Sequence, residues 1–453
     1  MINSLNKKNM GKKSENIIIG SGPAGRLAAL ELGILGKKAL LIEKNYIGGN
    51  CLNEGCMVLC ALSDIAIFLD NKKRYENLGL IKGDNLEIFY NEIVNKIRKT
   101  QEIIRKIHTH ENQSYGNTII HGEAEIFEDS VLVNGETFEY DNLLIATGSK
   151  PFIPNIKGSE YSLSSPDILK LDKVPEKLNV IGGGAIATEI SSLFSSFGCD
   201  VKMIVRGEFL KEIDKDLREF ISAKLLSNVE IHQNQNIVEI KKNSVICEDE
   251  EFTGTPFLAT GRSPNSEIAK DLVETNNKGA IIVDKMMRTS VNNIYAAGDV
   301  TGSVNLTPVA RMDGIVAGRN MAGYSNFIDY KKIPQGFGLN LNVDFVQDNE
   351  SVVQDNESED SDKKEIIIPA PAGPGTFWRV LTKDTGISKI RFNPKTKEIH
   401  WAGAVSPSSV SDVAYISYLM RTGHDMENFY EEFIEIHPST DVFHKLISEI
   451  YTH

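Results

Sequence analysis

Short apolar runs and longer helical stretches alternate along the first two thirds of the chain. The run from Ile17 to Ile19 precedes a helical stretch and then a second apolar run, Ala39 to Ile42, which ends at Glu43. The order returns later, where a strand and a helix lead to the apolar run from Val201 to Val205. Strands that alternate with helices are typical of a parallel sheet covered by helices. We therefore expect an α/β protein with two such units.

Other blocks complete the pattern. Segments 141–151 and 255–265 are apolar strands that run into Ala-Thr-Gly, and we interpret them as crossings between the two units. A helical stripe with one apolar face predicts core or dimer packing, and its residues are Phe89, Ile93, Ile97, Ile104 and Ile107. Residues 345–363 repeat VQDNES and then turn acidic, which favours a solvated insertion. The segment after it predicts two or three antiparallel strands, followed by helices at 409–421 and 426–433.

Composition narrows the function classes. The chain has 453 residues, 41% of them apolar and 25% charged, which predicts about two to four folded domains. A net charge of −13 disfavours nucleic acid or an anionic membrane as partner. The polar start lacks a signal peptide's apolar block, and no stretch looks long enough to span a bilayer, so we expect a cytoplasmic protein. Five cysteines do not make a disulfide scaffold, so any bridge is expected to be catalytic.

The first unit carries a glycine motif, Gly20-x-Gly22-x-x-Gly25, between its strand and its helix. Gly20 permits a tight turn, Gly22 lets a pyrophosphate approach the backbone, and Gly25 lets helix and strand pack closely. The helix N-terminus then faces the phosphates. Glu43 is placed to hold a ribose diol. A glycine motif alone often marks only a tight loop, but with strand, helix and acidic strand end present it predicts dinucleotide binding.

The second unit repeats the motif as Gly182-x-Gly184-x-x-Ala187, which predicts a second dinucleotide. Its second strand ends in Val205 and Arg206, so no carboxylate is available for a 2′-hydroxyl. Arg206, helped by Lys211, is suited to a 2′-phosphate, which favours NADPH over NADH. The alternative is that Arg206 is a solvated loop residue.

Three of the five cysteines, Cys51, Cys56 and Cys60, lie in GGNCLNEGCMVLCAL. They can be metal ligands, a redox-active disulfide or small apolar residues. A metal site would need a fourth ligand, and neither a CxxC nor a nearby histidine supplies one. We therefore expect no metal site. Cys199 and Cys247 lie among strand residues and are expected to fill space.

The motifs and their order resemble the flavoprotein pyridine nucleotide–disulfide oxidoreductases, the family of glutathione reductase, dihydrolipoamide dehydrogenase and mercuric reductase. The resemblance runs from Asn16 to Gly323 and resumes near the C-terminus. It implies two Rossmann-like dinucleotide-binding domains and a C-terminal α+β dimer-interface domain. The expected boundaries are a disordered tail over 1–15, the FAD domain over 16–150 and 265–330, the NAD(P) domain over 151–264, and the dimerisation domain over 331–453.

The resemblance also assigns cofactor residues. FAD is implied at Gly20, Gly22, Gly25, Glu43, Gly49, Asn50, Ala124, Thr147, Gly148, Asp299 and Ala310. The nicotinamide nucleotide is implied at Gly182, Gly184, Ala187, Glu189, Arg206 and Gly261. Val205-Arg206 and Ala187 look more like the NADPH-using glutathione reductases, so NADP is expected and NAD remains possible.

By the same resemblance Cys51 and Cys56 form a disulfide beside the flavin. Cys56 would be the charge-transfer thiolate and Cys51 the interchange thiol that attacks the substrate disulfide. Where the family has Pro-Ser-Lys after the second cysteine, this chain has Val58-Leu59-Cys60. The lysine partner of Glu189 is therefore missing, and we expect that carboxyl to shift toward its neutral form or to find another donor. Cys60 is either packing or a third thiol that exchanges with Cys56.

The C-terminal motif IHPSTDVF carries His437 and Pro438. In the family this histidine is the acid/base that keeps the interchange thiol of the partner subunit reactive, so a homodimer is implied. The glutamate that orients its ring is absent, because Val442 stands in its place and Asp441 precedes it.

The sequence thus predicts an FAD-dependent enzyme that passes electrons from NADPH through flavin and the Cys51–Cys56 disulfide to a small-molecule or protein disulfide. The alternatives are an NAD-using enzyme like dihydrolipoamide dehydrogenase and a flavin NAD(P)H reductase of quinone, oxygen or a metal ion. A flavin-binding redox sensor is the non-enzymatic alternative. No motif identifies the substrate.

Overall fold

The computed structural model describes residues 12–83, 86–348, 364–434 and 436–452. Its largest sheet has seven strands in the order β3-β2-β1-β6-β5-β4, with β16 beside β6. Strands β3, β2, β1, β6 and β16 pair in parallel, while β4 and β5 form an antiparallel meander with β6. The strands are β1 (Lys12–Ile19), β2 (Ala39–Glu43), β3 (Thr118–His121), β4 (Ala124–Ile126), β5 (Ser130–Val133), β6 (Glu136–Ile145) and β16 (Ile294–Ala296).

A second parallel sheet repeats this order with four strands, β10-β9-β8-β14. Its strands are β8 (Lys177–Ile181), β9 (Asp200–Ile204), β10 (Glu230–His232) and β14 (Thr255–Leu258). Helix α5 (Ala185–Ser196) connects β8 to β9, as α1 (Pro23–Ile34) connects β1 to β2. Two short strands, β7 (Ser149–Pro151) and β15 (Arg262–Pro264), pair where the chain passes between the two sheets. The two expected parallel units are therefore present.

Small residues let two helices of the first unit cross closely. A Cβ at Gly314 of α7 (Thr307–Met321) would lie 2.1 Å from the carbonyl oxygen of Ala24 in α1. Gly318 meets Ala28 in the same way, with 2.8 Å to its carbonyl oxygen. Only glycine fits at such an approach, so these two residues determine how closely α7 lies against α1.

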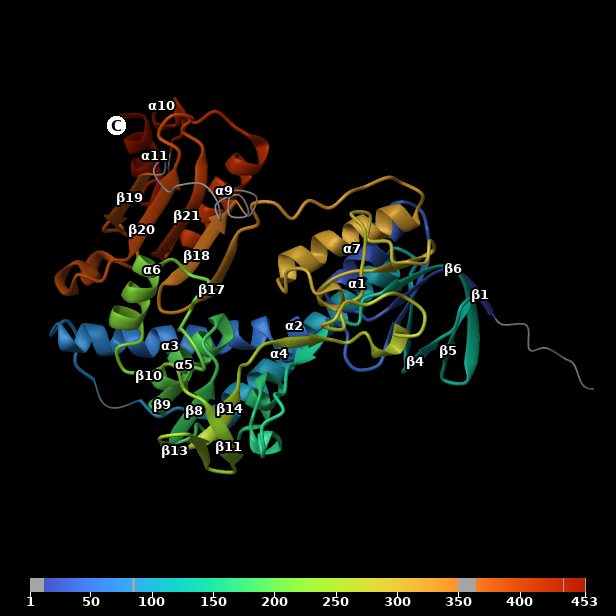
Figure 1. Ribbon diagram of the computed structural model, residues 1–453, viewed down its shortest axis with the longest axis horizontal. Coiled ribbons are helices and arrows are strands. Elements are labelled where there is room, and N and C mark those ends of the chain that lie inside the picture. The colour runs from blue at the N-terminus through green and yellow to red at the C-terminus, as the bar shows by residue number, and fades with distance from the viewer. Residues whose placement is uncertain (1–11, 84–85, 349–363, 435, 453) are drawn as a thin grey trace, which may run out of the picture.

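Three further helices extend from this unit toward the second one (Figure 1). They are α2 (Gly49–Asn53), α3 (Cys56–Asn77) and α4 (Tyr90–Ser114). Helix α3 contacts both α4 and α5, so it joins the two units. The predicted stripe on α4 is only partly covered, since Ile97 is buried whereas Phe89 and Ile107 are exposed.

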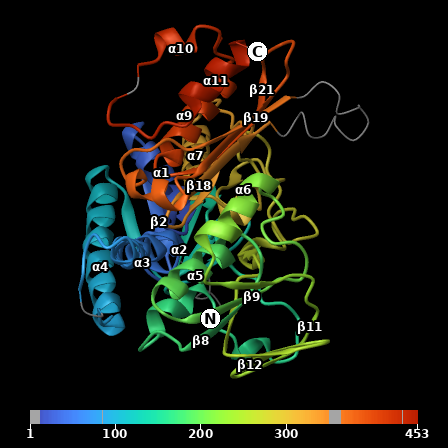
Figure 2. The ribbon, with the colours of Figure 1, turned by 90° about the vertical axis from the view of Figure 1, so that its left-hand side faces the viewer.

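The C-terminal part is a five-stranded antiparallel sheet with helices, seen at the upper left of Figure 1 and from another side in Figure 2. Its strands are β17 (Gln335–Gly338), β18 (Asn342–Gln347), β21 (Ile399–Ser406), β20 (Ile387–Phe392) and β19 (Lys364–Pro369), in that spatial order. The helices are α9 (Ser409–Thr422), α10 (Phe429–Glu432) and α11 (Phe443–Thr452). Helix α11 was not predicted, and α10 is shorter than expected.

Two expected boundaries are corrected. Residues 12–15, assigned to the tail, begin strand β1, where they pair in parallel with β6. Residues 345–347, assigned to the insertion, belong to β18, where Phe345 and Val346 are buried on opposite faces of the sheet: Phe345 packs in the core shared with α3 and α5, and Val346 in the core of the C-terminal part. The remainder of the predicted insertion, residues 349–363, lies outside the described residues.

The expectation that no stretch is long enough to span a bilayer also needs correction. Among the described residues, Gly49–Asn77 is long and apolar enough by length and composition, with 22% of its most apolar window buried. This stretch contains α2 and α3, which pack against each other, and α3 contacts α4 and α5. Its apolar side chains therefore take part in the fold of the two units.

Candidate active site

The loop between β1 and α1 forms a cradle at the carboxyl end of the first sheet. A Cβ at Gly20 would lie 2.3 Å from the carbonyl oxygen of Ala146, and one at Gly25 would lie 1.9 Å from that of Gly20. Gly22 caps α1 without any side-chain hydrogen bond. A Cβ there would meet nothing closer than the Cα of Gly49, 3.9 Å away. The first and third glycines thus close the turn, while the second leaves the helix N-terminus open to an anion.

Glu43 lies beside this cradle at the end of β2 and is buried. One carboxylate oxygen accepts hydrogen bonds from the backbone N–H and the hydroxyl of Ser21, at 2.9 and 2.6 Å. The other accepts from the backbone N–H of Asn45 at 2.8 Å. These donors fix the carboxylate at the mouth of the cradle, where a ribose diol would meet it.

The other predicted FAD residues surround the same edge of the sheet. Gly49 and Asn50 begin α2. Thr147 and Gly148 are bonded to Asn265, through the Thr147 hydroxyl at 2.6 Å and the Gly148 carbonyl at 2.9 Å. Asp299 accepts a 2.6 Å hydrogen bond from Ser149. Ala310 lies on α7 near Gly298, and Ala124 is buried on β4.

The second cradle has the geometry of the first. A Cβ at Gly182 would lie 2.3 Å from the carbonyl oxygen of Ala259, and Gly184 caps α5 with no side-chain hydrogen bond and open space around it. Ala187 is fully buried under the turn. Gly261 has a φ of +111° just after β14, and a Cβ there would meet no heavy atom within 4 Å. This cradle therefore also presents an uncapped helix N-terminus.

Arg206 follows the second strand of this unit and is exposed. Within the described part of the chain its guanidinium makes no hydrogen bond or ion pair. Lys211, the suggested helper, lies 3.6 Å from the carboxylate of Glu212. Arg206 is thus available to an anionic group, whereas Lys211 has an acidic neighbour.

The two redox candidates meet at the joint between α2 and α3. Both Cys51 and Cys56 are free thiols here. A hydrogen bond from the Cys56 thiol is the main cause that lowers the pKa of Cys51 to about 6. The same bond and burial raise the pKa of Cys56. The structure therefore favours negative charge on Cys51, the sulfur that family resemblance makes the attacking thiol, whereas the resemblance places the resting thiolate on Cys56.

Sequence reasoning missed two neighbours of this pair on α7. The hydroxyl of Thr307 lies 3.8 Å from the Cys56 sulfur, and its hydrogen bonding lowers the pKa of both thiols. The charge of Arg311 lowers the pKa of Cys51 as well. The available signal was the Thr-Pro start of a helix, since Pro308 fits a first turn. No sequence spacing links that helix to Cys56.

Glu189 shows both changes expected from the missing lysine. Burial is the largest cause that raises its pKa to about 7, with the charge of Cys56 as a further cause. The backbone N–H of Gly338 in β17 donates to its carboxyl at 3.0 Å, and so serves as the replacement donor. Burial and the nearby charges of Cys56 and Glu189 also raise the pKa of Cys60. The position of the family lysine thus holds a protonated thiol.

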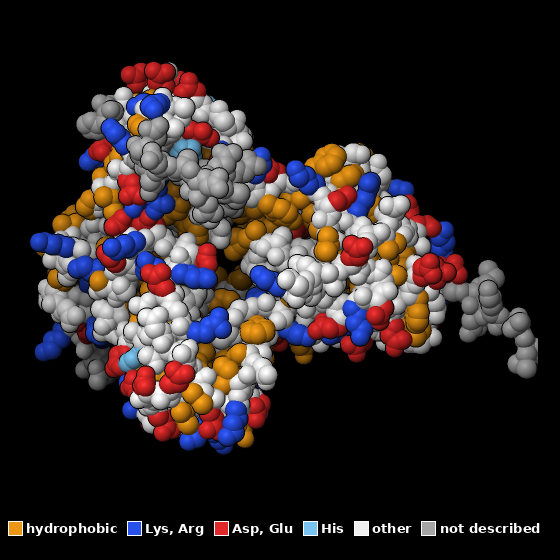
Figure 3. Space-filling view, viewed as in Figure 1, with side chains coloured by type: hydrophobic (Ala, Val, Ile, Leu, Met, Phe, Trp, Pro, Cys, Tyr) orange, Lys and Arg blue, Asp and Glu red, His pale blue; other side chains and the backbone are white. Residues whose placement is uncertain are grey.

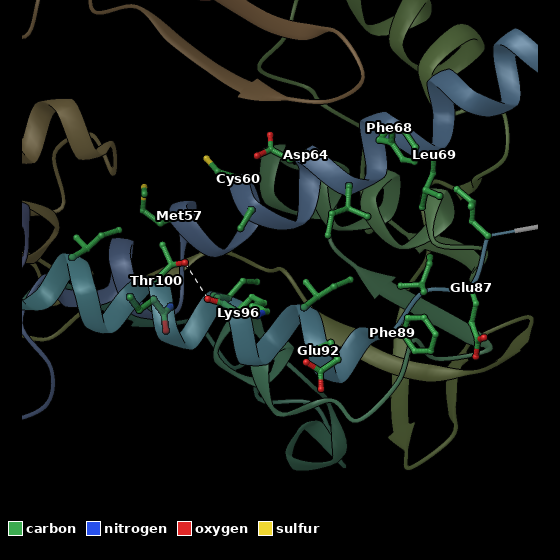
Figure 4. A pocket seen from close by; sticks show the side chains of 18 of the residues that line it. Met57, Cys60, Asp64, Phe68, Leu69, Glu87, Phe89, Glu92, Lys96 and Thr100 are labelled. Atoms are coloured by element: carbon green, nitrogen blue, oxygen red, sulfur yellow. Dashed lines mark hydrogen bonds between the residues drawn. The ribbon is translucent and has the colours of Figure 1, made fainter.

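An apolar groove of about 690 Å³ runs between α3 and α4. Met57 and Cys60 lie at one end of it and Phe68 and Phe89 at the other (Figure 4). In Figure 4, Cys60 and Asp64 project from α3 on the side away from α4. Figure 3 shows hydrophobic side chains gathered around a hollow near the middle of the molecule, where its three parts meet.

His437 is not brought to the cysteines within one chain. It lies exposed between α10 and α11, and no hydrogen bond or ion pair between described residues connects it to Cys51 or Cys56. Val442, at the position of the orienting glutamate, is buried in the core of the C-terminal part. Asp441 accepts from the backbone N–H of Phe443 at 2.8 Å and so caps α11.

The family model described as pyridine nucleotide-disulphide oxidoreductase matches residues 14–314 of this chain. An uncharacterised protein of Methanocaldococcus jannaschii is 30% identical over 442 residues, which are 94% of this chain and 96% of that protein. A dihydrolipoyl dehydrogenase of Bacillus subtilis is 32% identical over 352 residues, 71% of this chain and 73% of the relative. The chain belongs to the pyridine nucleotide-disulphide oxidoreductase family and is an oxidoreductase.

Solved structures show that the fold extends over the whole chain. The HOCl-induced flavoprotein disulfide reductase RclA from Escherichia coli superposes with a TM-score of 0.82 at 23% identity, over 95% of this chain and 98% of that one. A Cu(II) complex of a mutant of the same protein gives 0.83 at 23% identity, over 97% and 99%. The mixed α/β architecture with a C-terminal antiparallel sheet is therefore confirmed.

Family membership implies FAD and a nicotinamide nucleotide, and the two cradles fit such groups. Each has an uncapped helix N-terminus beside a glycine whose missing side chain leaves room, at Gly22 and at Gly184. Glu43 would supply the acceptor for a ribose at the first cradle. A flavin held there would supply the chemistry that accepts a hydride and passes on two electrons.

Proposed function

We propose that the protein is an FAD-dependent reductase that uses NADPH and a Cys51–Cys56 disulfide to reduce a small-molecule or protein disulfide in the cytoplasm. The observation that carries this proposal is the cysteine pair at the joint of α2 and α3, beside the N-terminus of α7. A thiolate, not a thiol, attacks a disulfide, and the pKa of Cys51 near 6 makes that sulfur anionic at neutral pH.

The residues divide the work in the following way. Gly20, Gly22, Gly25 and Glu43 hold FAD at the first cradle, and Gly182, Gly184 and Ala187 hold the nucleotide at the second. Cys51 attacks the substrate disulfide and is released when Cys56 closes the bridge again. In each cycle two thiols become one disulfide, the substrate disulfide becomes two thiols, and two electrons are transferred.

The proposal includes a homodimer in which His437 serves the cysteines of the other subunit. Its exposure and its distance in the chain from the cysteines agree with a role outside its own subunit. The exposed apolar neighbours Ile434 and Ile436, 86% and 87% accessible, would be covered by such an interface. A neutral imidazole there can take the proton of a leaving thiol near pH 7.

Single cysteine variants test this function. Cys51→Ser should abolish turnover with disulfides and leave one reactive thiol of the pair after reduction by NADPH. Cys56→Ser should also stop turnover, because no second sulfur can close the bridge. Cys199→Ser is the matched control, since Cys199 is buried far from this pair in the sequence and packs in the core of the second unit. Disulfide turnover by Cys51→Ser at the parent rate would refute the proposal.

A metal ion is the second candidate acceptor. The solved RclA structures include a Cu(II) complex, and this chain has three thiols along α2 and α3 with no lysine among them. Thiolates favour Cu(I), the ion that one-electron reduction of Cu(II) yields. NADPH-dependent reduction of Cu(II) that survives in Cys51→Ser would favour this candidate, and its loss together with disulfide turnover would favour the disulfide route.

A further inference from the structure

Among the described residues, the segment that carries His437 is exposed at its start and buried at its end. We call residues 436–442, which precede α11, the His437 loop. Ile436 and His437 at its start are exposed, whereas Thr440 and Val442 at its end are buried. The contacts of the buried end of the loop therefore restrict the position of the His437 imidazole.

The anchor comes from the beginning of α9. The hydroxyl of Ser408 lies 2.8 Å from the carbonyl oxygen of Thr440 and 2.6 Å from a carboxyl oxygen of Asp412. A serine hydroxyl carries one proton, so an ionised Asp412 competes with the carbonyl oxygen of Thr440 for it, whereas a protonated Asp412 can donate to Ser408 and leave the Ser408 proton for Thr440. Asp412 is thus connected to the loop through Ser408.

A second acidic group faces this anchor. Burial is the largest cause that raises the pKa of Asp412 to about 7, and the negative charge of Asp441 raises it further. The other groups that act on Asp412 are Ser408 and Ser411 of its own helix and the N–H of Val442 in the loop. The carboxylate of Asp441 is fixed by a hydrogen bond from the backbone N–H of Phe443, the first residue of α11.

We propose that Asp412 is a positioning residue that fastens the His437 loop to α9 and so sets where the imidazole is presented. In this chain it performs part of the task of the glutamate that Val442 replaces. The catalytic consequence rests on the proposed role of His437, whereas the fastening of the loop does not.

Protonation of Asp412 strengthens the anchor, because the neutral carboxyl can donate to Ser408, whose own proton then stays on the carbonyl oxygen of Thr440. The raised pKa means that the anchored loop binds the proton more tightly than the released loop does. The ordinary pKa of the carboxyl is 3.8, and its pKa in the anchored state is about 7. As the pH rises from 3.8 to about 7, the free energy that favours the anchored state over the released state decreases, and above pH 7 it stays constant. The equilibrium constant for release of the His437 loop should therefore increase by up to about tenfold per pH unit between these two pKa values.

Hydrogen–deuterium exchange of the full-length protein between pH 5 and 8, corrected for intrinsic rates, tests the anchor. Protection of amides in residues 436–442 should fall by about tenfold or more between pH 5 and 7 and then level off. Asp412→Asn can still form a hydrogen bond with Ser408 but cannot ionise, so the protection of the loop amides in this variant should not change with pH. An unchanged pH profile in Asp412→Asn would overturn the proposal.

Asp344 provides a matched control. It is another buried carboxyl with a raised pKa, about 6, and it accepts a hydrogen bond from Ser409 of the same helix. No described hydrogen bond connects it to the His437 loop. Asp344→Asn should keep the pH profile of the parent in the loop. A flattened profile in this control would also overturn the proposal.

Stopped-flow kinetics separate this inference from the proposed function. Asp412→Ala should slow thiol exchange with the substrate by about tenfold, while reduction by NADPH stays at the parent rate. Asp412→Asn should restore thiol exchange. If exchange of the loop amides behaves as expected but His437→Ala exchanges thiols normally, the anchor is supported and the proposed role of His437 fails.

Discussion

In the first βαβ unit the middle residue of the glycine motif is Ser21, whereas in the second it is Gly183. Ser21 donates two hydrogen bonds to Glu43 at the end of the neighbouring strand. A Cβ at Gly183 would instead lie 2.5 Å from a methyl carbon of Val205, so only glycine fits beside that strand end. In the first unit Ser21 thus matches the strand end through polar contacts with Glu43. In the second unit Gly183 matches it through the close approach of the Val205 methyl group.

The glycine turns of the two units share a backbone hydrogen bond to the neighbouring strand. The N–H of Gly20 donates to the carbonyl of Ile42 at 2.8 Å, and that of Gly182 donates to Ile204 at 3.0 Å. If each turn holds a dinucleotide, as we propose, one frame serves two ligands, and the strand end at Glu43 or Arg206 would distinguish them. Ligand choice would then lie in a few residues at the strand end, while phosphate binding would lie in the shared turn.

The largest expected effect is a difference in stability between substitutions at the third small residue of each motif, Gly25 and Ala187. Gly25→Ala would bring a methyl group to 1.9 Å from a backbone oxygen, so we expect a loss of about 3 kcal/mol of stability and loss of bound flavin. Ala187→Gly removes only one buried methyl and should cost about 1 kcal/mol. Thermal unfolding with flavin content measures both. Equal losses in the two variants would show that the two turns do not differ in how tightly they close.

A smaller effect concerns the choice of nucleotide at the second unit. Charge-assisted hydrogen bonds contribute about 1.5–3 kcal/mol each, but exposure lowers this value. Arg206→Ala should therefore reduce kcat/KM for NADPH by about tenfold and leave NADH unaffected. Lys211→Ala should have a weaker effect, since Glu212 lies beside it.

The double change Arg206→Ala with Val205→Glu extends this test, because it gives the second unit the acidic strand end of the first. It should turn the preference toward NADH in stopped-flow reduction of the flavin at low salt. A preference that ignores Arg206 would make it an ordinary surface residue.

A pH-dependent effect lies where the units meet, at Glu189. Its folded pKa of about 7 exceeds the ordinary 4.5, so the folded state loses stability as pH rises from about 4.5 to 7. Glu189→Gln should remove this loss and gain about 2 kcal/mol over the parent at pH 8 relative to pH 5. Urea midpoints at the two pH values measure it. Cys60→Lys should also raise stability at pH 8 relative to pH 5, because a cation lowers the pKa of Glu189. Equal pH dependence of the urea midpoint in the parent and in Glu189→Gln would contradict the account.

The sequence predicted the regions governed by local rules. Glycine turns, alternating strands and the cysteine spacing each have a physical signature within about twenty residues. Gly20 and Gly182 form tight turns and Glu43 ends β2, while their cofactor roles stay predictions. The unfilled partner of Glu189 was also predictable, since a missing cation leaves a carboxyl that must be neutralised or bonded.

Long-range placement could not be predicted. Gly338 is the donor to Glu189, and Thr307 lies beside Cys56, but 149 and 251 residues separate these pairs. Helix α11 has a strong apolar face, yet it follows the unusual His-Pro segment and was overlooked. Strand β18 was not predicted because its last residues, Val346 and Gln347, begin the VQDNES repeat, although Phe345 and Val346 are buried in the cores on the two faces of the sheet.

The proposal that electrons reach a disulfide through Cys51 and Cys56 can be checked by anaerobic titration with NADPH while the visible spectrum is recorded. We expect the yellow protein to develop a broad long-wavelength charge-transfer band after two electrons, together with one new pair of titratable thiols. Cys51→Ser should still show a thiolate–flavin band, and Cys56→Ser should not. Complete bleaching of the flavin at two electrons, without the band and without new thiols, would contradict the proposal.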